Sequence, residues 1–417
     1  MSSSVSPETA FRWAPWWVLA QVALWPTVGI AEGVLSLGAV FAIGMLLWHR
    51  FRGGTELLSR AAWALTSAMF LTYWLPEILS APFSVNPARS FSEAMVDLRY
   101  LPFLWLVAMA VATERGRAIT LRGIGAIAAV WLFDGMAQAL FSVSLGGASD
   151  AERLTGVFGA GNPKLGLVLA SLSPFVLHLG GRIGGSAGWL VAAALLVAVV
   201  LMAGARAAWV TLAIVLAISA VLRFGWRKSA YMGLAVLVLA GSAALISERL
   251  QGRLERTAVA LVGGEAGLDH ALSGRLPIWR AALTMYREHP VNGVGVRGFR
   301  DAYAEHAPAD DPWLQDGHDG AFHAHQIILE VASETGTLGL LIWLAGAALA
   351  WRAWRWSTPA ARERARIPAM ALAVTVFPLN THLAFYSTFW GGLALLLAAL
   401  YAGSLMARDP DADDHSA

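Results

Sequence analysis

Long apolar runs, each bounded by a few polar residues, make up most of this chain. A helix that crosses a bilayer needs about 20 mainly apolar residues. Ala and Gly are frequent inside the runs, as expected where helix backbones pack closely. The pattern predicts an all-α polytopic membrane protein with about twelve transmembrane helices, at residues 14–29, 31–48, 57–80, 98–113, 123–145, 164–181, 186–204, 207–223, 229–247, 326–350, 367–383 and 385–406.

Basic residues recur at every second gap between these runs, which predicts how the helices are oriented. Short cytoplasmic loops are enriched in Lys and Arg. The enriched gaps carry Arg50 and Arg52; Arg115, Arg117 and Arg122; Arg182; Arg223, Arg227 and Lys228; and Arg352, Arg355, Arg362, Arg364 and Arg366. Both termini are therefore expected in the cytoplasm. The segments expected outside are 81–97, 146–163, the turn near Arg206, 248–325 and 380–384.

The predicted organisation has four parts. Residues 1–247 hold helices one to nine, 248–325 form an outer loop region with short helices, 326–406 hold helices ten to twelve, and 407–417 are a cytoplasmic tail. A loop region of this size is short for an independent domain. We expect it to pack on the mouth of the bundle, with helical stretches at 250–263 and 274–288, the second of which ends at His289-Pro290.

Composition supports the membrane assignment and excludes several kinds of function. Hydrophobic residues make up 57% of 417 positions, charged residues 14%, and the mean hydropathy is +0.58. A net charge of only +2 gives no reason to expect nucleic acid. Cysteine is absent, which excludes disulfides and thiol chemistry. Residues 1–12 lack a basic segment and a cleavage site, so the first run is expected to be retained.

Two arginines on the predicted outer face are candidates for binding an anion. Arg206 lies between two apolar runs, where an arginine is costly unless it faces a cavity or a partner. The alternative is an interfacial arginine whose head reaches water. Arg275 begins the stretch Arg275-Leu-Pro-Ile-Trp279, and taken by itself it is better explained as a solvated loop residue.

A third candidate is His325, which opens the tenth predicted helix beside the outer loop region. A neutral imidazole is a suitable base near pH 7, although a histidine at an interface is more often a structural hydrogen-bonding group. Gln326 follows it, and after nine further residues comes Gly336-Thr-Leu-Gly339. Glu330 and Glu334, further along the helix, are either partners for polar groups or structural charges.

The outer gap before the sixth predicted helix carries the remaining polar candidates. It contains Arg153 and, in Gly161-Asn-Pro-Lys164, the side chains of Asn162 and Lys164. Amide and ammonium groups suit a sugar or a phosphate. A turn that merely starts a helix explains the same residues equally well.

Two further motif matches are discounted. The stretch Gly293-Val-Gly-Val-Arg-Gly298 fits GxGxxG, but no βαβ unit surrounds it, so a dinucleotide is not expected. His318, His323 and His325, with Asp316 and Asp319, have the composition of a metal cluster but match no established zinc spacing. We expect neither a metal ion nor another cofactor.

Together these residues resemble the O-antigen ligases, whose superfamily also holds O-antigen polymerases and pilin O-oligosaccharyltransferases. The ligase pattern H-[N/S/Q]-x9-G-x-x-G matches His325-Gln326 and Gly336-x-x-Gly339. Arg275 to Phe299 is similar to the core block of the superfamily, and Arg206 stands where the family has an arginine between two spans. A departure is Gly204-Ala205 before that arginine, where relatives often carry Ser.

The resemblance implies a GT-C-like glycosyltransferase of the bacterial inner membrane that acts in the periplasm without metal or nucleotide. The donor would be an O-polysaccharide on undecaprenyl diphosphate and the acceptor a sugar hydroxyl of lipid A-core oligosaccharide, with inversion at the anomeric carbon. Without a metal, arginines must stabilise the leaving diphosphate, which points to Arg206 and Arg275. His325 is the candidate base. Other candidate substrate-binding residues are Arg99, Arg153, Asn162, Lys164 and Gln326.

Alternatives remain open at this stage. A polymerase would share the arginines but does not typically show the His-Gln motif, and a protein-glycosylating relative would share that motif. A lipid-linked glycan transporter would need charged residues deep in several spans, and Glu77, Asp134 and Glu330 are few. A purely structural membrane protein would not need Arg206 and His325 on one face.

Overall fold

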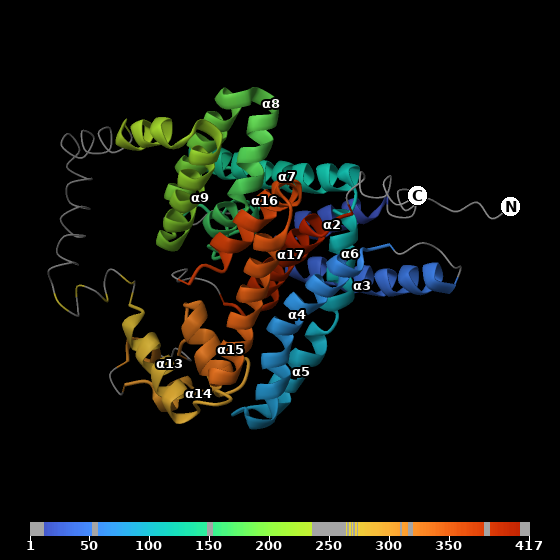
Figure 1. The fold of residues 1–417 in the computed structure, drawn as a ribbon. Helices are drawn as coiled ribbons and strands as arrows, with labels where there is room; N and C mark the ends of the chain where they lie inside the picture. The colour runs from blue at the N-terminus through green and yellow to red at the C-terminus, as the bar shows by residue number, and fades with distance from the viewer. Residues whose placement is uncertain are drawn as a thin grey trace.

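The computed structural model describes residues 12–51, 57–147, 153–235, 274–308, 311–315, 320–378 and 384–408, with positions 264, 267, 269 and 272. Within these ranges the chain is helical and contains no strand. Figure 1 shows the helices, which are α2 (Ala14–Ala23), α3 (Val28–Phe51), α4 (Arg60–Ser80), α5 (Pro87–Asp97), α6 (Tyr100–Ala110), α7 (Glu114–Phe141), α8 (Leu165–Met202), α9 (Arg206–Phe224), α13 (Leu276–Glu288), α14 (Phe299–His306), α15 (Ile327–Trp356), α16 (Pro359–Thr375) and α17 (Thr388–Leu405).

The helices follow the apolar runs, and several of them are suited to a bilayer. Among the described residues, α3, α7, α8, α9, α15 and α17 are the six helices long and apolar enough to cross a membrane. α2 and α6 have 10 and 11 residues, or about 15 Å at the usual rise, which is half of a hydrocarbon core. The structure is therefore consistent with a polytopic membrane protein, while the count of twelve spans stays a prediction.

Helix α8 contains two of the predicted runs, folded back on each other. It has 38 residues, and its backbone leaves helical geometry at Gly184 and Gly185, where φ at Gly185 is 58°. Gly180 and Gly188 face each other across this bend so closely that a side chain at either would meet the backbone of the other. The glycine-rich stretch therefore forms the turn of a helical hairpin, whose bend lies at the top of Figure 1.

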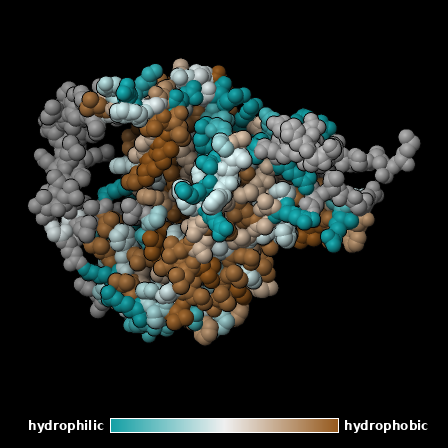
Figure 2. All heavy atoms as spheres, in the orientation of Figure 1, coloured by the Kyte–Doolittle hydropathy of each residue, from teal (hydrophilic) through white to brown (hydrophobic). Residues whose placement is uncertain are grey.

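The apolar interior centres on α17 and α6, which are buried on nearly all sides. The bundle around them leaves large apolar side chains outside, including Leu37, Val40, Leu341 and Trp351, each more than half exposed. Figure 2 shows such residues in brown over the outward faces of α4, α9 and α15. An apolar outer surface of this extent is typical of lipid contact.

Residues 81–97, the first segment predicted to lie outside, contact the loop between α13 and α14 and the start of α14. Val85 N–H donates to the carbonyl of Val294 over 3.0 Å, and Arg89 pairs with Asp301 at 2.6 Å. Helix α13 ends at Glu288, with His289 as its C-cap residue, as predicted from His289-Pro290. The predicted helical stretch at 250–263 lies outside the described residues, as does most of the run 229–247, of which residues 229–235 are helical.

Candidate active site

Arg206 occupies a tight turn between two packed helices. Helix α8 ends at Met202, Gly204 has a φ of 74°, and α9 begins at Arg206. The indole of Trp209 donates to the carbonyl of Val200 over 3.1 Å and closes the turn. A cation in the first turn of a helix meets the positive end of the helix dipole. The exposed Arg206 is therefore poorly placed to stabilise α9 and well placed to bind an anion.

Arg275 comes from a distant part of the chain and approaches Arg206. It is the N-cap residue of α13, and the first N–H of that helix, at Leu276, donates to the carboxylate of Asp269 over 2.9 Å. Partial burial, and then the charge of Arg206, lower the pKa of the Arg275 guanidinium below its ordinary value. Two like charges held near each other favour an anion between them.

The outer gap before α8 adds two more cations to this region. Gly166, in the first turn of α8, packs against Ala203 in the turn that precedes Arg206. A side chain added at Gly204 would lie 3.7 Å from Cγ of Arg153. Lys164 is the N-cap residue of α8, and burial lowers the pKa of its amine. Arg153 and Lys164 thus both lie beside the turn that carries Arg206.

Lys164 and Asn162 have different surroundings within this gap. The ammonium of Lys164 lies 4.4 Å from the centre of the Phe389 ring, at the start of α17. This cation–π contact fixes the amine at the mouth of the bundle. Asn162 shapes the turn through its backbone, since its carbonyl accepts from the N–H of Lys164 over 2.8 Å.

His325 is held next to α13 in a backbone conformation that residues other than glycine rarely adopt. Its φ is 53°, which costs about 1–2 kcal/mol for an ordinary residue. The indole of Trp279, one turn after Arg275, donates to the carbonyl of Ala324 over 3.1 Å. Backbone strain of this kind concentrates at functional sites. The contact brings the His325 loop to the same end of α13 as Arg275.

A second histidine, His323, lies against His325. Their ring centres are 3.9 Å apart, with the planes tilted by 49°. The sequence offered His323 only as a member of a metal cluster with His318, Asp316 and Asp319. Those last three positions lie outside the described residues. The His-x-His spacing was the signal for this contact, because the two histidines are only two residues apart and His325 itself has the left-handed backbone.

Gln326 supports the loop through both ends of its amide. Its Oε1 accepts from the N–H of Leu329 over 2.6 Å, which caps α15. Its Nε2 donates to the carbonyl of Pro378 over 2.7 Å. A carboxylate could not make the second bond and a hydroxyl would not reach both partners. These contacts favour a positioning role for Gln326 over direct binding of substrate.

The glycines of the motif join α15 to the loop region. At Gly336 the backbone has φ 65° and ψ −164°, which is accessible essentially to glycine alone. An unbroken helix would pair the N–H groups of residues 337 and 338 with the carbonyls of 333 and 334. Instead, Val294 and Gly295 donate to those carbonyls over 2.8 and 2.9 Å, and Thr337 and Leu338 donate to Pro290 and Val291 over 2.8 and 3.2 Å.

This arrangement, which we call the Gly336 joint (residues 290–295 and 333–338), explains Gly293 and Gly336. A side chain at Gly293 would meet the backbone of Glu334, and one at Gly336 would meet that of Val291. Gly339 packs beside Pro76 of α4. The GxGxxG match discounted as a dinucleotide loop is therefore a docking loop that carries the outer region on α15.

Replacing Gly336 by alanine is expected to destabilise the folded protein by at least about 2 kcal/mol, from the backbone strain alone. The added methyl group would also collide with the Val291 carbonyl. Thermal unfolding of purified protein in detergent measures the loss. Gly44→Ala in α3 is the matched control, because nothing lies within 4 Å of the added carbon there. Equal transition temperatures for the two variants would contradict the joint.

Arg99 contacts helix α3. Its guanidinium bonds to Glu32 and Ser36 of α3, in each case over 3.2 Å. The prediction that Arg99 binds a phosphate has no support in this geometry, which favours a brace between α3 and α6. The sequence could not reveal the pair, because Glu32 lies in the second predicted span and Arg99 in the fourth.

Buried acids surround the base of the loop region. Glu77, Asp97, Glu330 and Glu334 are each at most 3% exposed. Glu330 accepts from the N–H of Tyr386 over 3.2 Å, and Tyr73 donates to Asp97 over 3.3 Å. The sequence identified Glu330 and Glu334 as possible partners for polar groups, and it missed Asp97, which follows an exposed amphipathic stretch.

Asp97 is expected to make stability depend on pH. Burial, and then the charge of Glu93, raise the pKa of Asp97 from 3.8 to about 7. Between these values the folded state holds a proton that the unfolded state has released, so stability falls as pH rises through this window. Asp97→Asn should flatten that fall in a series of thermal unfolding measurements. The control Glu305→Gln, at an exposed site, should keep it; a wild-type slope in Asp97→Asn would contradict the assignment.

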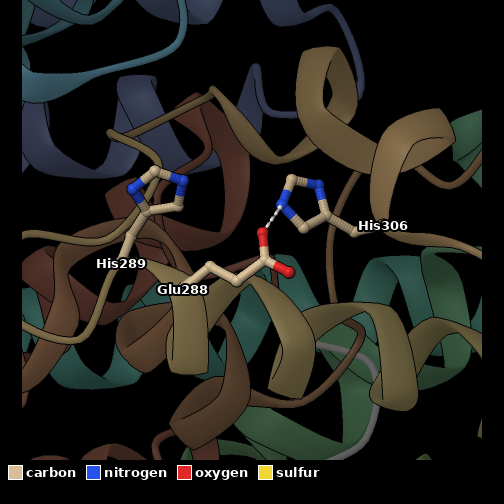
Figure 3. Close-up of side chains that lie close together, drawn as sticks. All are labelled: Glu288, His289 and His306. Carbon is tan, nitrogen blue, oxygen red and sulfur yellow. Dashed lines mark hydrogen bonds and ion pairs between the residues drawn. The ribbon is translucent and has the colours of Figure 1, made fainter.

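A separate cluster lies at the other end of α13. Figure 3 shows the rings of His289 and His306 on either side of the Glu288 carboxylate, with donor atoms within 4.8 Å of one another. His306 Nδ1 bonds to the carbonyl of Ala302 over 2.7 Å, and Nε2 bonds to Glu288 over 3.1 Å. Such a group can hold a metal ion. It lies about 20 Å from Arg275 along the helix, where it braces α13 and α14.

Comparison with known proteins finds a similarity to one described family over part of the chain. Residues 191–344 match the family model described as O-antigen ligase. No curated protein matches the chain. The matched range holds Arg206, Arg275, His325 and both halves of the Gly336 joint. Arg153, Asn162 and Lys164 precede it.

Proposed function

We propose that this chain is an O-antigen ligase of the bacterial inner membrane, because residues 191–344 match the family model described as O-antigen ligase. Members of this family are glycosyltransferase-like enzymes of glycan assembly that use lipid-linked polysaccharides. The proposed donor is a glycan on undecaprenyl diphosphate and the proposed acceptor a hydroxyl of lipid A-core oligosaccharide. Both substrates are lipid-anchored, and the candidate residues lie at the ends of apolar helices.

One observation carries this proposal. Two arginines and a histidine, from α9, α13 and the loop before α15, converge although about 120 residues separate the first from the last. The charge of Arg206 acts on Arg275, and Trp279 fastens the His325 loop to the same helix. Guanidinium groups suit a diphosphate and an imidazole suits a hydroxyl, so the three groups match the two reacting parts of a glycosyl transfer.

The proposed reaction is a single displacement. The acceptor oxygen attacks the anomeric carbon of the donor glycan, and the bond from that carbon to the diphosphate oxygen breaks. The hydroxyl proton passes to His325, and the diphosphate leaves with the electron pair of the broken bond. Arg206 and Arg275 stabilise the charge that develops there. Attack from the face opposite to the leaving group inverts the anomeric carbon.

The neighbouring cations extend this site. Arg153 and Lys164 lie beside the Arg206 turn, and we propose that they bind the donor diphosphate or phosphates of the acceptor core. Asn162 shapes the turn between them and is proposed to line the same subsite. The alternation of basic gaps supports placing this end of the bundle in the periplasm and both termini in the cytoplasm.

The experiment is a reconstituted transfer reaction. Purified protein in vesicles is supplied with undecaprenyl-diphosphate-linked glycan and EDTA, and in turn with lipid A-core, a second lipid-linked repeat unit, or pilin. Core-linked polysaccharide is the expected product. Chain extension would reassign the protein as a polymerase, and a glycosylated pilin as a protein O-oligosaccharyltransferase. No product from folded protein with any acceptor would overturn the enzymatic proposal.

A further inference from the structure

Two adjoining cavities open at the end of the bundle opposite to the candidate active site. The larger, of about 460 Å³, lies among α8, α9 and α16, and the smaller, of about 280 Å³, among α7, α8 and α16. His178, Arg182, Arg366 and Ile367 line both. The two cavities therefore adjoin, and we call them together the arginine groove.

Arginines dominate the polar lining of the arginine groove. Their positions are Arg117, Arg122, Arg182, Arg223, Arg364 and Arg366. The acidic side chains in the lining are Glu114 and Glu363, and Glu363 pairs with Arg366 at 2.8 Å. These groups come from the start of α7, the bend of α8, the end of α9 and the start of α16. An excess of cations in one concave site favours an anion with more than one charge.

One wall of the groove is apolar. Pro174 and Leu177 lie about two to three turns before the bend of α8, and Trp189, Leu222 and Met370 complete this wall. A soluble anion would use the arginines and leave this surface uncovered. A ligand with a phosphate head and a hydrocarbon tail would contact both parts.

We propose that the arginine groove binds an anionic phospholipid of the cytoplasmic leaflet that carries two phosphates, as cardiolipin does. Arg182 and Arg366 line both cavities, so each of these two arginines can contact both phosphates. The other arginines of each cavity contact only the phosphate that lies there. The guanidinium fork matches phosphodiester oxygens, and basic pockets between membrane helices are suited to such headgroups. The acyl chains lie along the apolar wall.

A cytoplasmic excess of arginine also orients helices during insertion, which needs charge but no cavity. The chain offers a control for this. Arg352 and Arg355, near the end of α15, precede the start of α16 by a few residues and are exposed, and neither lines the groove. They carry the same charge at the same end of the bundle.

Native mass spectrometry of the delipidated full-length protein tests the proposal. Wild type, Arg182→Gln/Arg366→Gln and Arg352→Gln/Arg355→Gln are titrated with cardiolipin, phosphatidylglycerol and phosphatidylethanolamine, and separately with inorganic pyrophosphate. Two arginines near a charged headgroup correspond to about 30-fold in affinity. We therefore expect the groove variant to bind cardiolipin about 30-fold more weakly, and the surface variant to bind it as wild type does.

Each other outcome counts against the proposal. Equal weakening in both variants would show that charge at this end, and not the groove, retains the lipid. Phosphatidylglycerol as tight as cardiolipin would overturn the assignment of two phosphates. Pyrophosphate as tight as cardiolipin would replace the lipid by a soluble anion. Thermal unfolding checks that the groove variant is folded, and a cardiolipin-dependent rise in its transition temperature equal to that of wild type would also overturn the proposal.

Discussion

His325→Asn is expected to lower the rate of glycan transfer by about 100-fold to 10,000-fold while leaving the protein folded. A positioned base contributes a factor of this size when the nucleophile is a neutral hydroxyl. Asparagine is the informative replacement because it tolerates the left-handed backbone that residue 325 adopts, with φ of 53°. It therefore removes the imidazole and spares the strained turn.

Two features of the measurement separate a base from a structural histidine. The transfer rate of the wild type should fall at acidic pH, where the imidazole is protonated. The residual rate of His325→Asn should not show this fall. His289→Asn is the matched control, because this exposed histidine belongs to the cluster at the far end of α13. A variant that keeps a tenth or more of the wild-type rate would remove His325 from the mechanism.

Arg206→Ala and Arg275→Ala are each expected to lower kcat by about 100-fold or more. Loss of one preorganised donor to a developing oxyanion costs about 3 kcal/mol. Lysine at either position should recover only part of the rate, since an ammonium lacks the bidentate fork. The double alanine variant should fall short of the product of the single effects, because the two guanidinium groups act on one leaving group.

The control for these variants is Arg287→Ala, an exposed arginine on the same short helix as Arg275. Initial rates over a range of donor concentrations separate kcat from KM. A change in KM alone would assign the arginines to binding of the ground state. Rates equal to those of Arg287→Ala would remove them from the site.

The sequence predicted the helices better than it predicted their ends. Apolar runs show which residues are covered by lipid or by the protein core. Where a helix starts depends instead on a capping hydrogen bond, which can lie outside the apolar run. Helix α7 begins at Glu114 and not at 123, because Thr113 accepts from the N–H of Gly116 over 3.1 Å. Helix α16 begins at Pro359 and not at 367, because Thr358 caps it by accepting from the N–H of Ala361 over 3.2 Å. Both first turns lie outside the apolar runs.

The candidate residues were found by type and by position relative to the membrane. The convergence of Arg153 and Lys164 on the Arg206 turn depends on packing between the two ends of α8, which the bend at Gly184 and Gly185 allows. No local pattern encodes that contact. The Gly336 joint pairs backbone groups about 40 residues apart. Backbone hydrogen bonds do not depend on the type of side chain, so the glycines that permit the pairing are its only sign in the sequence.

The Gly336 joint also sets limits on how this protein can be recombined with others. The loop and the broken helix complete each other's backbone pairing, so neither half keeps its geometry beside a partner of different shape. A chimera that exchanges residues 290–339 as one cassette moves both halves together. One that exchanges only the stretch between α14 and Gln326 leaves the joint whole. An exchange designed to change the acceptor preference should therefore replace either residues 290–339 together or only the stretch between α14 and Gln326.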